Sequence, residues 1–515
     1  MQKNSFLFGT FILILVNFIV RFLGFSYKIV LSRMIGPEGI GLFHLVFPIL
    51  MTFITFTTAG IPVAVSKLVA YHLSLNNKKG CNKTLALSLS IGLMISCFLS
   101  ILLFYNARYI SHVIIKNKDA YFSLIALIPA IPLITLSSIF RGYYYGIKNV
   151  GPPGMAQILE QIFRILFVIG TLHFFIPIET KYSAMIAVIG ISVGELAGLL
   201  WLLLKFPLLE ALHLRKTYYV LKKGSKGILR KIILTSIPIT VTRLIAVVMQ
   251  SINAVLIPQK LQIAGYTPQE AIATFGKLAG MALPLLFLPF IVTSALVVNI
   301  IPTISQEMAL KNTKGIGLKS SLAIRITLLV AIPATFLFVF FATPICEFIY
   351  NQPDVGIYLS FLAYGIIFLS LHHTMSGILH GMGKEVITTI HYLLGMIFQL
   401  LCTYHLVSNP KFAATGFIIG FILSTSIICT LNMITLTRYV KLNISVLNAI
   451  IKPIFASVIM IILVVNIYKI CRYIDLSSIL SIASSLSSGF LGYILIVFLS
   501  GSINFQTLQY IFFKK

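Results

Sequence analysis

The chain is poor in charged residues, and acidic residues are the scarcer kind. Of its 515 residues only 10% are charged and only 12 are Asp or Glu, whereas 58% are hydrophobic and the mean hydropathy is +1.00. A soluble domain of this size would need far more polar surface. The composition therefore excludes a soluble globular protein and predicts an all-α integral membrane protein.

Sites that could carry catalysis or bind a metal are also lacking. None of the six cysteines stands in a CxxC or metal-ligand spacing, and we interpret them as small apolar residues. His373 and His380 lie about 10 Å apart along a helix, too far to chelate one metal. The chain has no Ser-His-Asp order and no paired-carboxylate motif. We therefore expect no catalytic residue, no metal and no cofactor, and a carrier rather than an enzyme.

The excess of positive charge, a formal net charge of +27, is best explained by membrane topology. The basic residues fall mainly in short connections between apolar runs, which does not favour a nucleic-acid partner. If the N-terminus is cytoplasmic, most of the 39 Lys and Arg lie in cytoplasmic connections, so both termini are expected inside. The first apolar run continues past Arg21 without a small-residue cleavage site, which indicates a retained span.

Apolar segments long enough to cross a bilayer recur along the whole chain. A hydrocarbon core about 30 Å thick needs ~20 mostly apolar residues per helix. By this measure we predict about fourteen transmembrane helices. The expected spans are 6–31, 40–69, 84–105, 121–140, 155–176, 183–204, 232–257, 277–301, 321–343, 357–379, 386–407, 412–436, 447–470 and 479–500.

A basic connection at 205–231 divides the chain into two halves that look related. Gly41 and Ser66 recur as Gly280 and Ser305, 239 positions later. Gly146-Ile-Lys-Asn-Val recurs as Gly381-Met-Gly-Lys-Glu-Val, 235 positions later. These matches predict two six-helix repeats and a terminal helix pair, with substrate bound between the halves and access alternating. The predicted parts are a lobe at 1–204, the connection, a second lobe at 232–440 and two further helices with a short tail at 441–515.

Three arginines, Arg21, Arg164 and Arg243, lie inside predicted spans. A central arginine costs ~2.5–3.5 kcal/mol on insertion scales, and such residues usually face a bundle interior or a water-filled cavity. In the first span Asn17, Arg21, Gly24 and Lys28 share one helical face. We expect this polar stripe to face a central cavity, in preference to a snorkelling Arg21.

The fifth predicted span carries a longer polar stripe, formed by Gln157, Glu160, Gln161, Arg164 and Thr171. Glu160 precedes Arg164 by four residues, the favourable order for an ion pair within a helix. The pair fits a structural brace as well as a substrate or proton-linked role. Glu195 in the next span is a further interior charge that could complete this network or titrate, as Glu160 could.

Arg243 lies on a polar face of the seventh predicted span, at much the same depth as Arg21 in the first. Two guanidinium groups facing each other across a cavity would repel unless an anion lay between them. Arginine presents a planar fork of donors that matches phosphate or carboxylate oxygens. We therefore expect a phosphate-bearing lipid as the substrate, held by Arg21 and Arg243 in a cavity shaped by Asn17, Gln157, Glu160, Gln161 and Arg164.

Several runs of sequence resemble the stage V sporulation protein B family. The resemblance covers residues 5 to about 400, and the last two spans carry none of its motifs. The runs include Arg21-Phe-Leu-Gly-Phe, Ile35-Gly-Pro-Glu-Gly-Ile-Gly-Leu, Gly60-Ile-Pro-Val-Ala-Val-Ser-Lys-Leu-Val, Phe140-Arg-Gly-Tyr-Tyr-Tyr-Gly and Gln157-Ile-Leu-Glu-Gln-Ile-Phe-Arg.

That family belongs to the multidrug, oligosaccharidyl-lipid and polysaccharide flippase superfamily, so the resemblance implies two six-helix bundles in a V around a central cavity. It also implies flipping of a polyprenyl-pyrophosphate-linked saccharide in a bacterial plasma membrane, in particular the peptidoglycan precursor lipid II for spore cortex. Related lipid II flippases carry a functional arginine in their first helix, and Arg21 matches it. No ion-binding set transfers, so coupling to the membrane potential or to a monovalent ion is left open.

Two other functions remain open. A cation-coupled multidrug exporter is disfavoured, because drug-exporting relatives use an acidic residue in the first helix and this chain has none there. A non-transporting scaffold would recruit cell-wall synthesis enzymes through the basic connection 205–231, but it explains the buried charges poorly. The expected partners are therefore a lipid-linked saccharide, membrane lipids and, for the scaffold, those enzymes.

Overall fold

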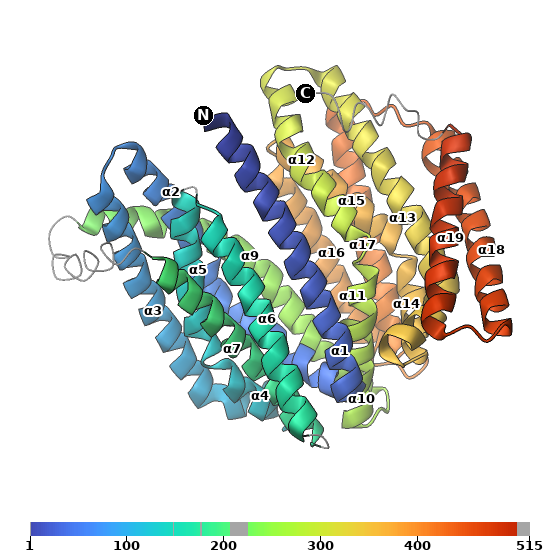
Figure 1. Cartoon of the computed structure of the whole chain (residues 1–515), viewed down its shortest axis with the longest axis horizontal. Helices are drawn as coiled ribbons and strands as arrows, with labels where there is room; N and C mark the ends of the chain where they lie inside the picture. Colours follow the sequence, from blue (N-terminus) through green and yellow to red (C-terminus); the bar gives the residue numbers. More distant parts are fainter. Residues whose placement is uncertain (1, 148, 176–177, 207–224, 502–515) are drawn as a thin grey trace. The chain divides into compact units, whose positions relative to one another are not determined.

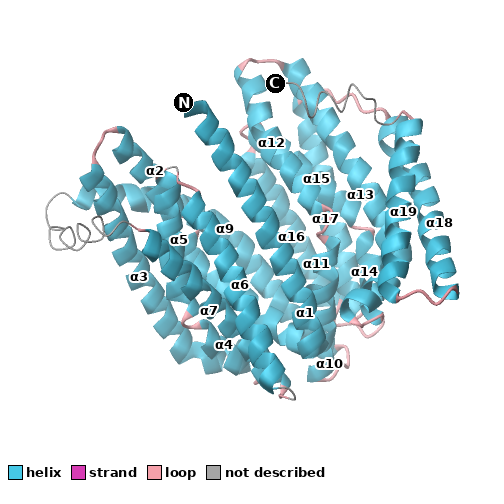
Figure 2. Cartoon of the chain, viewed as in Figure 1, coloured by secondary structure: helices cyan, strands magenta, loops and turns pink. Residues whose placement is uncertain are grey.

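The computed structural model describes residues 2–147, 149–175, 178–206 and 225–501, and within these ranges every regular element is helical (Figures 1 and 2). Twelve helices are long and apolar enough to cross a membrane, or thirteen if the bent pair Asp354–Ala363 and Ile366–Gly381 is one span. One of the twelve, Ile19–Ser74, contains the predicted span 40–69 and the second half of the predicted span 6–31. The predicted all-α polytopic membrane fold is confirmed for this part of the chain.

Contacts divide the chain into two compact units, which we describe separately. Unit 1 comprises Met1–Gln259 and Tyr266–Gly276, and unit 2 comprises Lys260–Gly265 and Lys277–Lys515. Contacts thus place α9 up to Gln259 in unit 1, although the sequence repeat puts this helix at the start of the second lobe. Most of the basic connection, 207–224, lies outside the described residues. The predicted lobes and their V arrangement stay predictions.

Unit 1 is built from two long helices and a set of shorter ones. Its elements are α1 (Gln2–Thr58), α2 (Ile61–Ser74), α3 (Lys78–Tyr109), the π-helical η1 (Ile110–Ile115), α4 (Ala120–Leu127), α5 (Ala130–Gly146), α6 (Gly151–Phe175), α7 (Thr180–Lys205), α9 (Ser225–Ile263, up to Gln259) and α10 (Pro268–Phe275). α1 bends at Gly36, where φ is +67°, a left-handed conformation that glycine adopts without a steric penalty. One buried core joins α2, α3, α5, α6 and α7.

Unit 2 repeats this order and adds a terminal pair. Its elements are the π-helical η2 (Gly276–Ala282), α11 (Leu283–Leu286), α12 (Phe290–Ala309), α13 (Thr313–Tyr350), α14 (Asp354–Ala363), α15 (Ile366–Gly381), α16 (Glu385–Leu406), α17 (Ala414–Tyr439), η3 (Leu447–Ile451), α18 (Lys452–Tyr473) and α19 (Ser478–Leu499). Its core joins α12, α13, α15 and α17. The Tyr493 hydroxyl on α19 donates to the carbonyl oxygen of Leu329, 2.8 Å away, which ties the terminal pair to α13.

Local backbone features recur in the two units 235 positions apart. Asn77 caps α3 by accepting from the Gly80 amide, and Asn312 caps α13 by accepting from the Gly315 amide. Lys116 and Asn351 follow η1 and α13 in the left-handed conformation, with φ of +59° and +55°. The capping side chains and the left-handed residues therefore agree between α3 with η1 in unit 1 and α13 in unit 2.

The same shift relates the tight helix contacts. Gly146 on α5 lies against the backbone of Ser66 and the side chain of Val69 on α2. Gly381 on α15 lies against the equivalent Ile301 and Ile304 on α12. These contacts follow the 235-residue shift and not the 239-residue shift that paired Ser66 with Ser305. The sequence match at Gly146 and Gly381 therefore has the correct register for α2 to α7 and α12 to α17.

Candidate functional site

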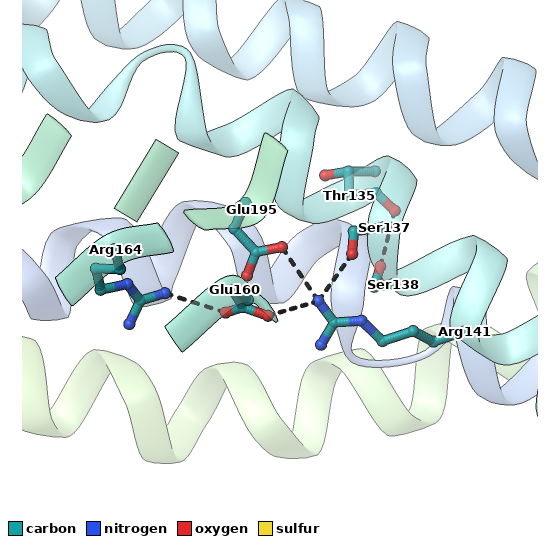
Figure 3. Close-up of polar contacts among 7 residues, drawn as sticks. All are labelled: Thr135, Ser137, Ser138, Arg141, Glu160, Arg164 and Glu195. Atoms are coloured by element: carbon teal, nitrogen blue, oxygen red, sulfur yellow. Dashed lines mark hydrogen bonds and ion pairs between the residues drawn. The ribbon is translucent and has the colours of Figure 1, made fainter. Parts of the chain in front are cut away.

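A cluster of four charged side chains lies within unit 1, where α5, α6 and α7 meet (Figure 3). Arg141 on α5 donates from Nη2 to Glu160 Oε2 on α6 at 3.0 Å and to Glu195 Oε2 on α7 at 3.2 Å. Arg164 donates from Nη2 to Glu160 Oε1 at 3.0 Å. With every group ionised, the two positive and two negative charges cancel.

The cluster is buried, so its charges must compensate one another. Glu160 and Glu195 are 7% and 6% exposed. The side chains of Arg141 and Arg164 are 19% and 17% exposed. An isolated buried charge would cost several kcal/mol, and a partner together with good hydrogen bonds offsets that cost. The cluster can therefore persist inside a membrane protein.

Arg141 is the centre of this network. Its Nη2 atom has three acceptors within 3.2 Å, since the Ser137 hydroxyl also accepts from it at 2.8 Å. That nitrogen carries two hydrogens, so three full hydrogen bonds cannot form at once. At most two of the bonds to Ser137, Glu160 and Glu195 are therefore full hydrogen bonds at one time, unless two acceptors share one hydrogen.

Three glycines on α7 bring this helix against α6. A Cβ atom at Gly194 would lie 2.5 Å from the carbonyl oxygen of Glu160, and one at Gly190 would lie 2.2 Å from Val168 Cγ2. A Cβ atom at Gly198 would lie 3.2 Å from the carbonyl oxygen of Ala156. Small residues four apart allow membrane helices to approach closely. This close approach sets the turn of α7 that carries Glu195 directly against the turn of α6 that carries Glu160.

The two polar stripes predicted on the first and fifth spans meet in unit 1. A Cβ atom at Gly24 on α1 would lie 3.9 Å from Gln161 Oε1 on α6, and one at Gly154 would lie 3.0 Å from Val16 Cγ2. Gln161 Oε1 is buried and, among the described residues, has no hydrogen-bond partner. Gln157 is half-buried on the same helix. The predicted Glu160–Arg164 ion pair is present.

The two arginines predicted to hold the substrate lie outside this cluster. Arg21 on α1 and Arg243 on α9 are both exposed, and both belong to unit 1. Asn17 lies on α1, but its side chain is outside the described part of the structure. That Arg21 and Arg243 face each other across a cavity stays a prediction.

Sequence reasoning missed Arg141. The fourth span was predicted to end at residue 140, which left Arg141 in a connection, whereas α5 continues to Gly146. The tyrosines that follow Arg141 were the available signal, because Tyr143 and Tyr144 are buried in the core of unit 1. Glu195 was identified as an interior charge, and the structure places it in the same network.

Comparison with known proteins identifies related sequences over most of the chain. The family described as polysaccharide biosynthesis protein matches residues 6–308, more than half of the chain, and the family described as MatE matches residues 263–405. Stage V sporulation protein B of Bacillus subtilis (strain 168) is 28% identical over 447 residues, which cover 87% of this chain and 86% of that protein. The resemblance found in the sequence is therefore confirmed.

Two further proteins are similar to this chain. The lipid II flippase MurJ of Bacillus subtilis (strain 168) is 23% identical over 432 residues, which cover 79% of this chain and 78% of that protein. A solved structure described as lipid II flippase MurJ in an inward closed conformation has a TM-score of 0.68 at 16% identity, over 94% of this chain and 97% of that one. A solved structure of a multidrug resistance MATE family transporter in an inward-facing conformation has a TM-score of 0.66 at 16% identity, over 80% of this chain and 92% of that one. These structures show that the fold is that of a membrane transporter.

Proposed function

We propose that this chain, which belongs to the polysaccharide biosynthesis protein family, flips a polyprenyl-pyrophosphate-linked saccharide across a bacterial plasma membrane. The substrate we favour is the peptidoglycan precursor lipid II, used for spore cortex, and the mechanism is alternating access. Both termini lie in the cytoplasm in this proposal. The names of two relatives, a sporulation protein and a lipid II flippase, support this choice of substrate.

The observation that carries the proposal is the exposure of Arg21 within a candidate membrane span, Ile19–Ser74. A guanidinium group at membrane depth is costly against lipid, so an exposed one is expected to face a water-filled cavity. Arg243 is exposed in the same way at the start of another candidate span. Guanidinium groups in such a cavity favour an anionic head group, and pyrophosphate offers oxygens for bidentate hydrogen bonds.

The ion cluster supports an anionic rather than a cationic substrate. A cation-coupled multidrug exporter is the second candidate, favoured by the match to the MatE family. In the described part of unit 1, however, the two buried carboxylates, Glu160 and Glu195, are already paired with guanidinium groups. The cluster has no surplus negative charge for a cationic drug, whereas Arg21 and Arg243 add positive charge to the exposed surface of unit 1.

The test is a vesicle assay with purified protein and labelled lipid II. Losing a hydrogen bond to a charged group costs about 1.5–3 kcal/mol, so Arg21→Ala should slow flipping by roughly 10- to 150-fold. Arg472→Ala is the matched control, because Arg472 is exposed at the end of α18 and should leave flipping unchanged. Equal flipping by Arg21→Ala and wild type would rule out the anion site. Drug efflux without lipid flipping would support the second candidate.

A further inference from the structure

A polar network in unit 2 joins the three helices equivalent to those of the ion cluster in unit 1. Asn432 on α17 is fully buried. Its side-chain oxygen lies 2.8 Å from Nδ1 of His391 on α16. Its side-chain nitrogen donates to the Ser376 hydroxyl at 3.0 Å and to the His372 carbonyl oxygen at 3.4 Å, both on α15. The network therefore connects α15, α16 and α17.

The network uses the same positions of the repeat as the centre of the ion cluster. The 235-residue shift carries Ser137 to His372 and Arg141 to Ser376. In unit 1 these positions carry a hydroxyl and a guanidinium that bond to each other. In unit 2 both positions are contacted by Asn432. The place where these three helices meet is thus polar in both units. In unit 1 it holds charged side chains, and in unit 2 it holds an imidazole, an amide and a hydroxyl group.

The contacts of Asn432 determine which nitrogen of His391 carries the proton. The His372 carbonyl can only accept, so it faces the amide nitrogen of Asn432, and the amide oxygen faces His391. An amide oxygen can only accept, so His391 Nδ1 must be the protonated nitrogen. In the neutral ring, Nε2 then carries the lone pair.

This arrangement can take up a proton without rearranging. The imidazolium form keeps Nδ1–H, and with it the bond to Asn432, while Nε2 gains the new proton. The His391 ring is half-buried, in contrast to the fully buried Asn432. Uptake of a proton at Nε2 therefore changes the charge of the network but not its hydrogen bonds.

No carboxylate on the neighbouring helices would neutralise the added charge. α16 packs against α15 and α17, and neither of these helices contains Asp or Glu. Arg438 stands six residues after Asn432 on α17, and Glu385 stands six residues before His391 on α16, each about 9 Å away along its helix. His380 is bonded to Thr388, 2.8 Å away. The titratable or charged side chains on the two helices are His372, His373 and His380 on α15 and Cys429, Arg438 and Tyr439 on α17.

We propose that His391 Nε2 is the site at which unit 2 binds a coupling proton, with Asn432 as the residue that orients the ring. The proton is taken from water by the Nε2 lone pair and returned to water from the same atom, so no other bond forms or breaks. Because protonation adds one positive charge to the protein, proton binding and binding of an anionic substrate should favour each other. The coupling role rests on the proposed function, whereas protonation of His391 does not.

The first experiment tests protonation alone. Full-length protein labelled with ¹⁵N-histidine in lipid nanodiscs is titrated by NMR, and His391→Gln assigns the ring signals. The neutral form should be protonated at Nδ1 and bare at Nε2, and Nε2 should gain a proton when the pH is lowered. Asn432→Leu should give a mixture of the two neutral tautomers. A neutral ring protonated at Nε2, or a ring that does not titrate, would overturn the proposal.

The second experiment tests coupling in vesicles that contain labelled lipid II. Flipping by the wild type should change with pH by up to about tenfold per pH unit, the limit for one titrating group. His391→Gln should remove this dependence. His405→Gln, on the exposed end of the same helix, should leave it unchanged. A pH-dependent wild type matched by His391→Gln would overturn the coupling role, whereas no flipping at any pH would instead count against the proposed function.

Discussion

Arg141 and Glu160 form an ion pair between α5 and α6, with Nη2 3.0 Å from Oε2. Glu160 pairs at the same time with Arg164 on its own helix. One carboxylate thus receives two guanidinium groups, and Glu195 supplies the second negative charge. The stability of unit 1 should therefore depend on the balance of this cluster more than on any single bond.

Removing the charge of Glu160 should strongly destabilise the protein. Glu160→Gln would leave two arginines with one carboxylate in a buried site, and unpairing a buried charge costs about 3–5 kcal/mol. Thermal unfolding of the purified protein measures the loss. Glu179→Gln is the control, since Glu179 is exposed and its pairing with Lys181 should contribute little. Equal melting temperatures of the two variants would contradict a stabilising role of Glu160 in the buried cluster.

Replacing a pair of opposite charges should cost less than replacing one. Arg141→Met and Glu195→Met should each destabilise, and the double variant should lose less than their sum, with a coupling energy of about 0.5–3 kcal/mol. The double variant also separates the two roles left open for the cluster. If it folds and still flips lipid II at the wild-type rate, the cluster is a structural brace. If it folds and does not flip lipid II, the cluster takes part in transport.

Close packing of α7 on α6 gives a further prediction. Gly194→Ala would place a Cβ atom 2.5 Å from the carbonyl oxygen of Glu160, so the helices must separate. The expected loss of stability is about 1–3 kcal/mol. Gly170→Ala on α6 is the control, because nothing lies within 4 Å of its Cβ position. That variant should be neutral or slightly more stable, since alanine favours a helix.

Much of the fold follows from patterns in the sequence, and the exceptions have physical causes. Long apolar runs and the shift between Gly146 and Gly381 predict the helices and the repeat, because lipid demands such runs and glycine allows the close contact. Hydropathy cannot place the end of a helix that carries a charge inside its last turns. Arg141 was therefore assigned to a connection, although α5 continues past it.

The partners of charged residues are harder to predict when they lie on different helices. The pair of Glu160 and Arg164 follows from helical spacing alone. The contacts of Arg141 with Glu160 and Glu195 depend on how α5, α6 and α7 pack, and no periodicity within one helix encodes that. The glycines spaced four apart on α7 were the readable signal that this helix packs tightly.

A glycine substitution at two equivalent positions of the units should change stability in the same direction. Lys116 and Asn351 both adopt positive φ at the end of a helical segment, where glycine is preferred. Lys116→Gly should relieve about 1–2 kcal/mol of left-handed strain, from which the added entropy of the unfolded chain subtracts about 0.4–1 kcal/mol. Asn351→Gly should gain less, because asparagine tolerates this conformation better than lysine. Thermal unfolding measures both, and a loss of stability at Lys116 would contradict the left-handed backbone there.

If Arg21 and Arg243 hold one pyrophosphate group, their substitutions should not be independent. Each single alanine variant should weaken binding of lipid II, and the loss in the double variant should differ from the sum by about 0.5–3 kcal/mol. Lysine at either position should restore part of the affinity, because it keeps the charge but not the bidentate fork. Binding to protein in nanodiscs measures all the variants. Additive losses, or full recovery with lysine, would show that the two residues, both exposed in unit 1, do not share one bidentate anion.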